Sequence, residues 1–149
     1  MPTHEFTAEV SWHGGGGLPA AGTHRVTLPG RPPLEVSAAP QYRGDPSKPN
    51  PEELFLASLA SCQLLSFLAL AGRGGLSVTA YDDHPTATLA IADRKMRVTQ
   101  VVLRPRITLA PGGDAAKART VVDQAHEACF IANSVACAVR VEPEIVVAT

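Results

Sequence analysis

The chain has 149 residues and a formal net charge of −1, which is the size of one ordinary domain. Charged residues make up 18% of the sequence and apolar residues 45%, whereas charged residues usually account for about 25%. The balanced charge argues against nucleic acid as the main partner, because no basic excess is present to neutralise phosphates. The low charge excludes a disordered chain and predicts one compact domain over residues 1–149 that hides surface in an obligate oligomer.

The N-terminal third predicts three short strands and an irregular connector. Residues 4–12 alternate between apolar and polar, which is typical of a half-buried strand. Residues 23–28 and 34–38 indicate two further strands, separated by a proline- and glycine-rich turn at 29–33. The four glycines at 14–17 lack the Lys-Ser/Thr of a phosphate-binding loop, so they favour a flexible hairpin connection. A polar connector then runs from Pro40 to Pro49.

A long apolar helix follows the connector. Leu54 to Ala71 is a run of 18 residues without a charge, at the lower length limit of a transmembrane helix. Its serines and Gln63, together with the two glutamates directly before it, favour a helix buried nearly all round inside a soluble assembly.

The ends of this helix carry ordinary start and stop signals. Asn50 is suited to the N-cap, Pro51 to the first helical position and Glu53 to a capping box. Three glycines at 72, 74 and 75 are expected to end the helix.

The second half of the chain predicts strands around one more helix. Residues 76–92 and 95–109 indicate two long strands, the first bent at His84-Pro85. Asp114 is expected to cap a helix that runs to about Cys129, and a final strand covers 136–147. Strands in runs rather than in alternation with helices predict an α+β fold with antiparallel sheet.

Three cysteines are too few for the disulfide scaffold of a secreted mini-protein. The N-terminus has no signal-peptide pattern, so a reducing cytoplasm is the expected compartment. His126 and Cys129 are spaced for two metal ligands on one helix, but no further ligands are evident nearby, and we expect no metal. Cys137 falls on the predicted last strand, where core packing is its expected role.

Two motifs carry a resemblance to a known family. They read Asn50-Pro51-Glu52-Glu53-Leu54 followed by Ala60-Ser61-Cys62, and Ala125-His126-Glu127-Ala128-Cys129 followed by Asn133-Ser134. With the element order between them, they resemble the OsmC/Ohr family of organic hydroperoxide reductases over almost the whole chain. The resemblance implies an α+β fold of antiparallel sheets around long central apolar helices, in an intertwined homodimer.

The resemblance also implies a thiol peroxidase without metal, haem or other bound cofactor. Cys62 matches the peroxidatic cysteine, which attacks an organic hydroperoxide and becomes a sulfenic acid. Cys129 matches the resolving cysteine, which condenses with that acid to a disulfide. In the family an external dithiol reductant, typically a lipoylated protein, then reopens the disulfide.

A cation is needed to activate Cys62. Attack requires a thiolate, whereas a free cysteine has a pKa of about 8.5, and a helix dipole acts only within the first turn. In the Ohr branch the cation is an arginine in the glycine-containing loop, but residues 12–18 contain none. In the OsmC branch it precedes the Asn-Pro-Glu motif, which points to Arg43, with Arg25 as the second candidate. Glu52 matches the acidic residue that holds this arginine.

Two further features of the motifs bear on function. Phe130 stands where many members have proline, and with Ile131 it enlarges the apolar wall beside the resolving cysteine. Glu52 and Cys62 are ten positions apart, about 15 Å along a helix, so one arginine cannot contact both within one straight helix. Because the run has no helix breaker, we expect Glu52 to serve Cys62 of the other subunit. The alternative function is a non-enzymatic, stress-associated or ligand-binding domain with vestigial cysteines.

Overall fold

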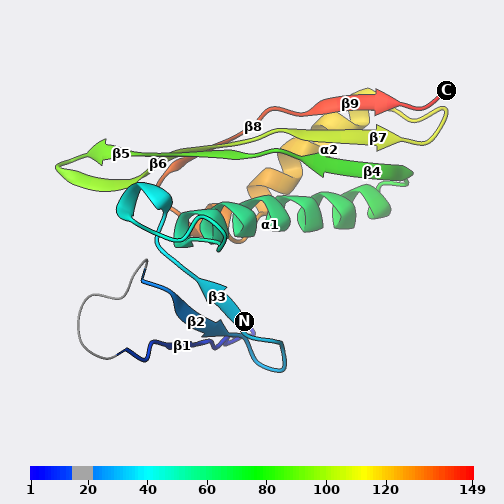
Figure 1. Cartoon of the computed structure of the whole chain (residues 1–149). Coiled ribbons are helices and arrows are strands. Elements are labelled where there is room, and N and C mark those ends of the chain that lie inside the picture. The colour runs from blue at the N-terminus through cyan, green and yellow to red at the C-terminus, as the bar shows by residue number, and fades with distance from the viewer. Residues whose placement is uncertain (15–21) are drawn as a thin grey trace. The chain divides into compact units, whose positions relative to one another are not determined.

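The computed structural model of the chain describes residues 1–14 and 22–149 (Figure 1). The chain divides into two compact units, Met1–Leu54 and Phe55–Thr149, and each is described by itself. Gly15 to Gly17, for which we expected a hairpin connection, lie outside the described residues. The fold is α+β, as predicted from the sequence.

The N-terminal unit contains an antiparallel sheet of three short strands. β1 (Glu9–Ser11) pairs with β2 (His24–Thr27), and β2 pairs with β3 (Leu34–Val36). All three are shorter than predicted, and residues 4–8 are not part of a strand. The connector contains a 3₁₀ turn, η1 (Pro40–Tyr42), followed closely by Gly44. A Cβ at Gly44 would lie 1.5 Å from the carbonyl oxygen of Ala38, so only glycine fits there.

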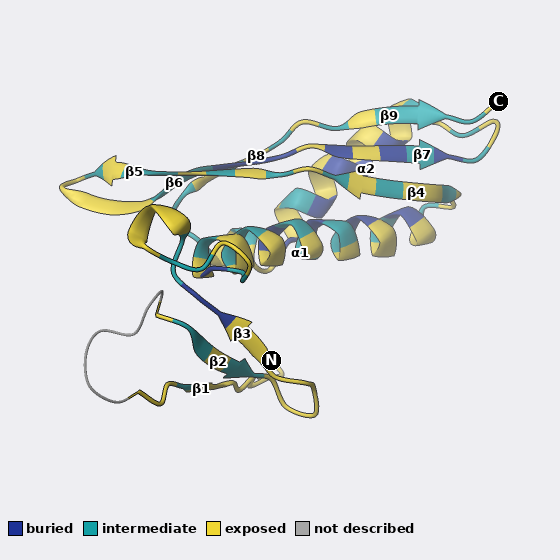
Figure 2. Cartoon of the chain, in the orientation of Figure 1, coloured by how far each residue is buried: buried dark blue, intermediate teal, exposed yellow. Residues whose placement is uncertain are grey.

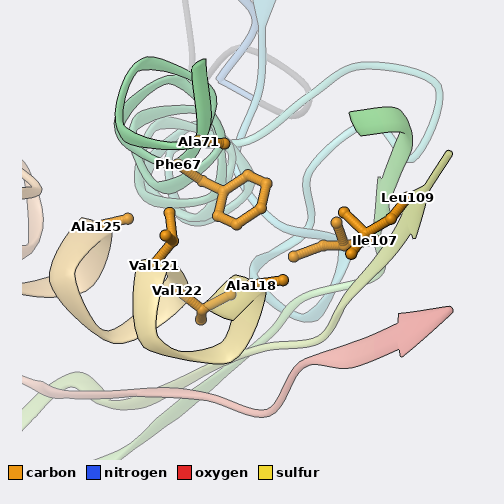
Figure 3. Close-up of a cluster of buried hydrophobic side chains, with 8 residues drawn as sticks. All are labelled: Phe67, Ala71, Ile107, Leu109, Ala118, Val121, Val122 and Ala125. Atoms are coloured by element: carbon orange, nitrogen blue, oxygen red, sulfur yellow. The ribbon is translucent and has the colours of Figure 1, made fainter. Parts of the chain in front are cut away.

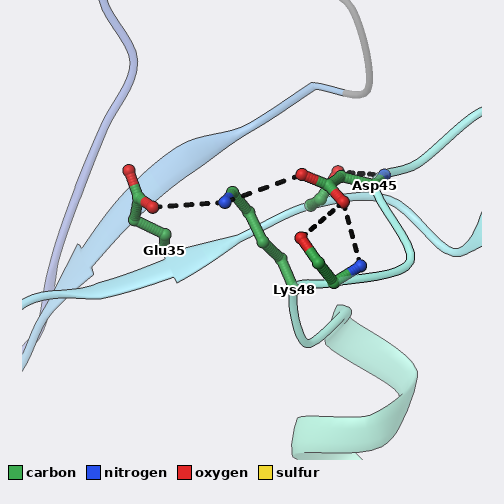
Figure 4. Close-up of polar contacts among 5 residues, drawn as sticks. Glu35, Asp45 and Lys48 are labelled. Carbon is green, nitrogen blue, oxygen red and sulfur yellow. Dashed lines mark hydrogen bonds and ion pairs between the residues drawn. The ribbon is translucent and has the colours of Figure 1, made fainter.

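Ion pairs tie the connector to β3 in this unit (Figure 4). Lys48 Nζ lies 3.3 Å from Glu35 Oε2 and 3.6 Å from Asp45 Oδ2. The backbone N–H and the hydroxyl of Ser47 both donate to Asp45 Oδ1, at 2.9 and 2.7 Å. The side chains of Lys48, Asp45 and Glu35 are 25%, 33% and 61% exposed, and ion pairs that water reaches contribute at most about 1 kcal/mol. Among the described residues of the unit only Val36, Ser37 and Asn50 are buried, so this unit has almost no core of its own.

Helix α1 (Pro51–Arg73) begins and ends as the sequence predicts. Asn50 Oδ1 accepts from the Glu53 N–H at 2.9 Å, and Glu53 Oε2 accepts from the Asn50 N–H at 3.1 Å, which forms a capping box. At the other end Gly75 has a φ of +73°. The Leu76 N–H donates to the Ala71 carbonyl and the Gly75 N–H to the Gly72 carbonyl, the hydrogen-bond pattern of a Schellman motif.

The expectation that α1 is buried nearly all round is not met within the single chain. Its buried residues form one stripe of four-residue spacing: Leu59, Gln63, Phe67 and Ala71. Leu65 and Leu68 remain 64% and 43% exposed. In the described part of the chain, α1 is the one helix long and apolar enough to cross a membrane by length and composition. Core helices of soluble proteins share these properties, and its buried stripe packs as theirs do.

The C-terminal unit contains two three-stranded sheets. The first has the order β4 (Val78–Asp83), β7 (Pro105–Leu109), β9 (Glu144–Val147), and the second the order β5 (Thr86–Ala92), β6 (Lys95–Leu103), β8 (Ala138–Val141). The bend expected at His84-Pro85 separates β4 from β5. Unexpected breaks at Arg104 and at 142–143 divide the other two predicted strands.

The predicted antiparallel pairing is present in both sheets of this unit, and each sheet also contains one parallel pair. β4 with β7 and β5 with β6 are antiparallel, but β6 with β8 and β7 with β9 are parallel. The physical reason is the connection through α2 (Ala115–Ala128), which is long enough to carry the chain back so that β8 and β9 run in the direction of β6 and β7.

The main core lies between the two helices and the first sheet (Figures 2 and 3). Phe67 points from α1 into the space between Val121 of α2 and Ile107 of β7, and it is fully buried. Replacing such a residue by alanine typically costs about 3–5 kcal/mol. A second cluster consists of Leu59, Val101 and Leu103. Asp114 caps α2 as predicted, with Oδ1 accepting from the Lys117 N–H at 3.0 Å. These contacts pack α1, which carries Cys62, against α2, which Cys129 directly follows.

Candidate active site

The structure brings together two of the four predicted site residues, Cys62 and Cys129. Cys62 lies in the middle of α1 and is half-buried, whereas Cys129 directly follows the last residue of α2 and is 1% exposed. Both cysteines are free, and a hydrogen bond joins their side chains. Two sulfurs in this contact can form a disulfide after one of them is oxidised.

Two backbone N–H groups donate to the sulfur of Cys62. Partial burial acts to raise the pKa of the Cys62 thiol, but the N–H of Ile131, the thiol of Cys129, the N–H of Phe130 and the hydroxyl of Ser66 act against it. The pKa of Cys62 is lowered as the net result. Successive backbone N–H groups that converge on one point form a nest for an anion. These donors supply activation that our sequence reasoning assigned to an arginine alone.

Cys129 has the opposite electrostatic balance. Burial raises the pKa of its thiol, and the hydrogen bond with Cys62 raises it further. The Ala132 N–H donates to Cys129 Sγ at 3.4 Å and only partly offsets these effects. Within the pair, Cys62 is therefore the sulfur that ionises first, and Cys129 remains the thiol that donates to it.

The turn after α2 explains how the N–H groups reach Cys62. The helix ends at Cys129, whose backbone is extended, and a short 3₁₀ helix, η2 (Ala132–Ser134), follows. Asn133 Nδ2 donates to the Glu127 carbonyl at 3.0 Å, and Ser134 Oγ donates to the Phe130 carbonyl at 2.7 Å. The Asn-Ser pair of the second motif thus holds the turn that presents the two N–H groups.

Arg43, Glu52 and the second candidate Arg25 lie in the N-terminal unit. Arg43 follows η1 with a left-handed backbone, φ +65°, a conformation that is uncommon for residues other than glycine and is found at functional sites. Glu52 is in the first turn of α1, and Arg25 is exposed on β2 opposite Glu35. None of the ion pairs found within residues 1–14 and 22–149 involves these three residues. Their roles stay predictions.

Helix α1 is continuous from Pro51 to Arg73. A break in the helix, which would be the other way to bring Glu52 and Cys62 of one chain together, therefore does not occur. In a regular helix their ten-residue separation corresponds to about 15 Å along the axis. The remaining alternative, a site shared between two subunits, stays a prediction.

Two buried polar groups on β4, of which Tyr81 interacts with Cys129, carry no sequence signal. Tyr81 and Asp83 are two apart on β4, so their side chains project to the same face. Burial raises the pKa of both groups, and the charges of Asp83 and Cys129 raise that of Tyr81 further. The Arg104 N–H donates to Asp83 Oδ1 at 2.7 Å. Tyr81 Oη and Asp83 Oδ2 are buried without a partner among the described residues. Tyr81 and Asp83 reach this part of the fold because β4 pairs with β7 beside the helices.

The remaining candidates from the sequence do not form a second centre. Among the described residues, no group of three or more histidine, cysteine, aspartate or glutamate side chains is placed to hold a metal. Cys137 precedes β8 by one residue rather than lying within it, and it packs against the second core cluster as expected.

Comparisons with known proteins agree with the two motifs. The sequence model of the OsmC-like protein family matches residues 44–144. A solved OsmC-like protein of unknown function from Vibrio cholerae is 30% identical, with a TM-score of 0.87, and the match covers 95% of this chain and 99% of that one. No curated protein sequence matches the chain.

Two solved structures named as organic hydroperoxide resistance proteins share the fold. The protein from Elizabethkingia anophelis is 18% identical, with a TM-score of 0.74 and 99% of both chains covered. The protein from Bacillus subtilis is 21% identical, with a TM-score of 0.62, and the match covers 94% of this chain and 98% of that one.

Proposed function

We propose that this chain, which belongs to the OsmC-like protein family, is a thiol peroxidase that reduces organic hydroperoxides to alcohols. The observation that carries the proposal is the hydrogen-bonded pair of free thiols with opposite pKa shifts. A peroxidase of this kind needs one sulfur that is ionised and one that is kept protonated until the first has reacted. The hydroperoxide resistance names of several structural neighbours support the same substrate class.

In the first step the thiolate of Cys62 attacks the terminal oxygen of the hydroperoxide. The O–O bond breaks, Cys62 becomes a sulfenic acid, and the alkoxide takes a proton to leave as the alcohol. Sulfur is oxidised and the peroxide is reduced by two electrons. The N–H groups of Phe130 and Ile131 and the hydroxyl of Ser66 lower the pKa of Cys62, so that a larger fraction of it is thiolate at neutral pH.

In the second step the thiol of Cys129 attacks the sulfur of the sulfenic acid. The S–S bond forms, the S–O bond breaks, and the thiol proton leaves with the hydroxyl as water. An external dithiol, for which a lipoylated protein is our candidate, then reduces the disulfide and becomes a disulfide itself. No metal or bound cofactor takes part in this scheme. Its need for a dithiol reductant suits a reducing cytoplasm as the working compartment.

We infer that the working form is a homodimer. Leu65 and Leu68 of α1 are exposed in the single chain, and Phe130 is 80% exposed. Leu65 and Leu68 are three apart and so lie on one face of α1, and large apolar side chains exposed on one face mark a surface that binds a partner or a ligand. A second copy that covers this face would complete the burial of α1, and the aromatic ring of Phe130 would form part of an apolar wall that favours alkyl or aryl hydroperoxides over hydrogen peroxide.

Thiol titration before and after one equivalent of cumene hydroperoxide tests the proposed function. We expect two thiols per chain to be lost, while Cys137 stays reactive, and alcohol to form in equal amount. If no thiol is lost and no alcohol forms, the peroxidase proposal is wrong, and the alternative of a binding domain with vestigial cysteines replaces it.

A further inference from the structure

Gln63, the residue directly after Cys62, is the one polar member of the buried stripe of α1. Its exposed fraction is 0%. Its Nε2 donates to the backbone carbonyl of Val122, in the middle of α2, at 3.2 Å. Its Oε1 is buried and has no partner among the described residues. A buried amide with one unpaired oxygen normally destabilises a fold, so its place between two packed helices calls for an explanation.

The rest of this interface defines the helix register only weakly. Phe67 and Ala71 of α1 face small and β-branched residues of α2, namely Ala118, Val121, Val122 and Ala125 (Figure 3). Apolar contacts of this kind tolerate small shifts, because volume and pattern matter more than any single contact. The best-attested role of a buried polar residue in such an interface is to fix register.

The register of these helices decides where the two sulfurs lie. Cys62 is adjacent to Gln63 in α1, and Cys129 follows Val122 by seven residues, which is two turns or about 10 Å of helix. A slide or rotation of α2 along α1 would move Cys129 Sγ and the N–H groups of the following turn away from Cys62 together. Those contacts are the ones on which both chemical steps depend.

We propose that Gln63 is a positioning residue whose hydrogen bond to the Val122 carbonyl sets the register of α1 against α2 and thereby holds Cys129 and the following turn against Cys62. The proposal rests on the proposed function in so far as the disulfide is catalytic. Closing of the disulfide can nevertheless be measured without any peroxide, by using diamide as the oxidant, which takes two electrons and two protons from the thiol pair.

The test compares Gln63→Met with the wild-type chain. Methionine has nearly the same length as glutamine but no hydrogen-bond donor. The substitution removes the hydrogen bond, which destabilises the fold, and also the unpaired oxygen, which stabilises it, so the melting temperature should change little. We expect diamide to close the Cys62-Cys129 disulfide about tenfold more slowly or worse, since a misplacement of 1 Å can cost on the order of 100-fold. The thiolate absorbance of Cys62 should also titrate at higher pH.

Leu59→Met is the matched control, because Leu59 is one turn earlier in the same stripe and makes only apolar contacts. Its Cys62-Cys129 disulfide should close at the wild-type rate. Gln63→His keeps a ring N–H donor and should close faster than Gln63→Met. Gln63→Leu repeats the test if the methionine variant does not fold.

Slow closing in Gln63→Met with recovery in Gln63→His supports the proposal. It is overturned if Gln63→Met closes at the wild-type rate, or if the histidine variant is as slow as the methionine variant, because the donor would then be irrelevant. These results do not depend on peroxide. A chain that closes normally with diamide but ignores cumene hydroperoxide would contradict only the proposed peroxidase function.

Discussion

The groups expected to make up the active site lie in two regions with very different surroundings. In the C-terminal unit the sulfurs of Cys62 and Cys129 lie beside a packed core, with backbone N–H donors aimed at one of them. In the N-terminal unit Arg43 is exposed, and the ion pairs of Lys48 are partly open to solvent. Fixed donors near low-dielectric material act strongly, whereas charges in water are screened.

This difference suggests how the work is divided. The groups that lower the pKa of Cys62 all belong to the C-terminal unit. An arginine from the N-terminal unit would strengthen the effect only where assembly removes it from water. The predictions below change one region at a time and ask which of the two controls each step.

The largest effect is expected from the sulfurs themselves. Cys62→Ser removes the nucleophile and should lower peroxide turnover by at least about 1,000-fold. Cys129→Ser should still permit one oxidation per chain, after which Cys62 proceeds to sulfinic acid. Stopped-flow peroxide consumption and mass spectrometry of the product measure both. Cys137→Ser is the matched control and should behave as wild type. Normal turnover in Cys62→Ser would contradict the proposed mechanism.

The next largest effect concerns the N-terminal region. Arg43→Asn removes the charge while keeping a residue that accepts the left-handed backbone. We expect the first oxidation step to slow by about 10–100-fold, the value of a charge-assisted hydrogen bond. Arg25→Asn is the control, and Arg43→Lys should recover part of the rate. If Arg43→Asn is as fast as wild type, the backbone donors of the C-terminal unit suffice.

Dimers made of two different variants test whether Glu52 and Cys62 of one active site come from one chain or from two. Glu52→Ala and Cys62→Ser proteins should each be inactive or nearly so. After complete subunit exchange, half of the dimers are mixed and each has one intact shared site, so about a quarter of the wild-type activity should return. Turnover should follow the fraction of mixed dimers, measured by native mass spectrometry. Mixed dimers that stay inactive would place Glu52 and Cys62 of one chain in one site.

Local signals in the sequence predicted the helix ends, whereas the approach of the two cysteines was implied by the resemblance of the two motifs to the family. The capping box of Asn50 with Glu53 and the cap at Asp114 depend on residues within one turn, so they can be read from spacing. The parallel pairing of β8 with β6 and of β9 with β7 could not be predicted from spacing, because it is decided by the crossover through α2. The donors of Phe130 and Ile131 are backbone groups, which every sequence has, and Gln63 gains its meaning only from Val122 across the interface.

A smaller effect is expected from Ser66, whose hydroxyl is one of the donors that lower the pKa of Cys62. Ser66→Ala should raise that pKa, so the first oxidation slows about 3–10-fold at neutral pH and recovers as the pH rises. Ser58→Ala is the control, since that hydroxyl donates to the Phe55 carbonyl at 2.7 Å. A slowdown that persists at high pH would mean that Ser66 acts by packing and not on ionisation.

The smallest effect is the change in stability when the disulfide closes. Cys62 and Cys129 enclose 66 intervening residues, for which the chain-entropy model gives about 4 kcal/mol. Oxidation also removes the charged sulfur that the N–H groups of Phe130 and Ile131 stabilise. For a chain of this size about 4 kcal/mol corresponds to a rise in melting temperature of about 8–16 °C. The rise on oxidation should therefore be smaller than this.

The pH dependence of this shift separates the two contributions. Because the pKa of Cys62 is lowered by folding, the reduced form gains stability as the pH rises from the folded pKa toward the unfolded value of about 8.5, and loses it as the pH falls. Cys129, whose pKa is raised in the folded state, has the opposite effect, but only as the pH approaches the unfolded value of about 8.5. The calorimetric shift should thus be larger at about pH 5 than at about pH 8. Other titrating groups, such as Asp83, are present in both forms and largely cancel. A full-sized shift that does not change with pH would mean that the bridge is structural and that the backbone donors do not stabilise a thiolate.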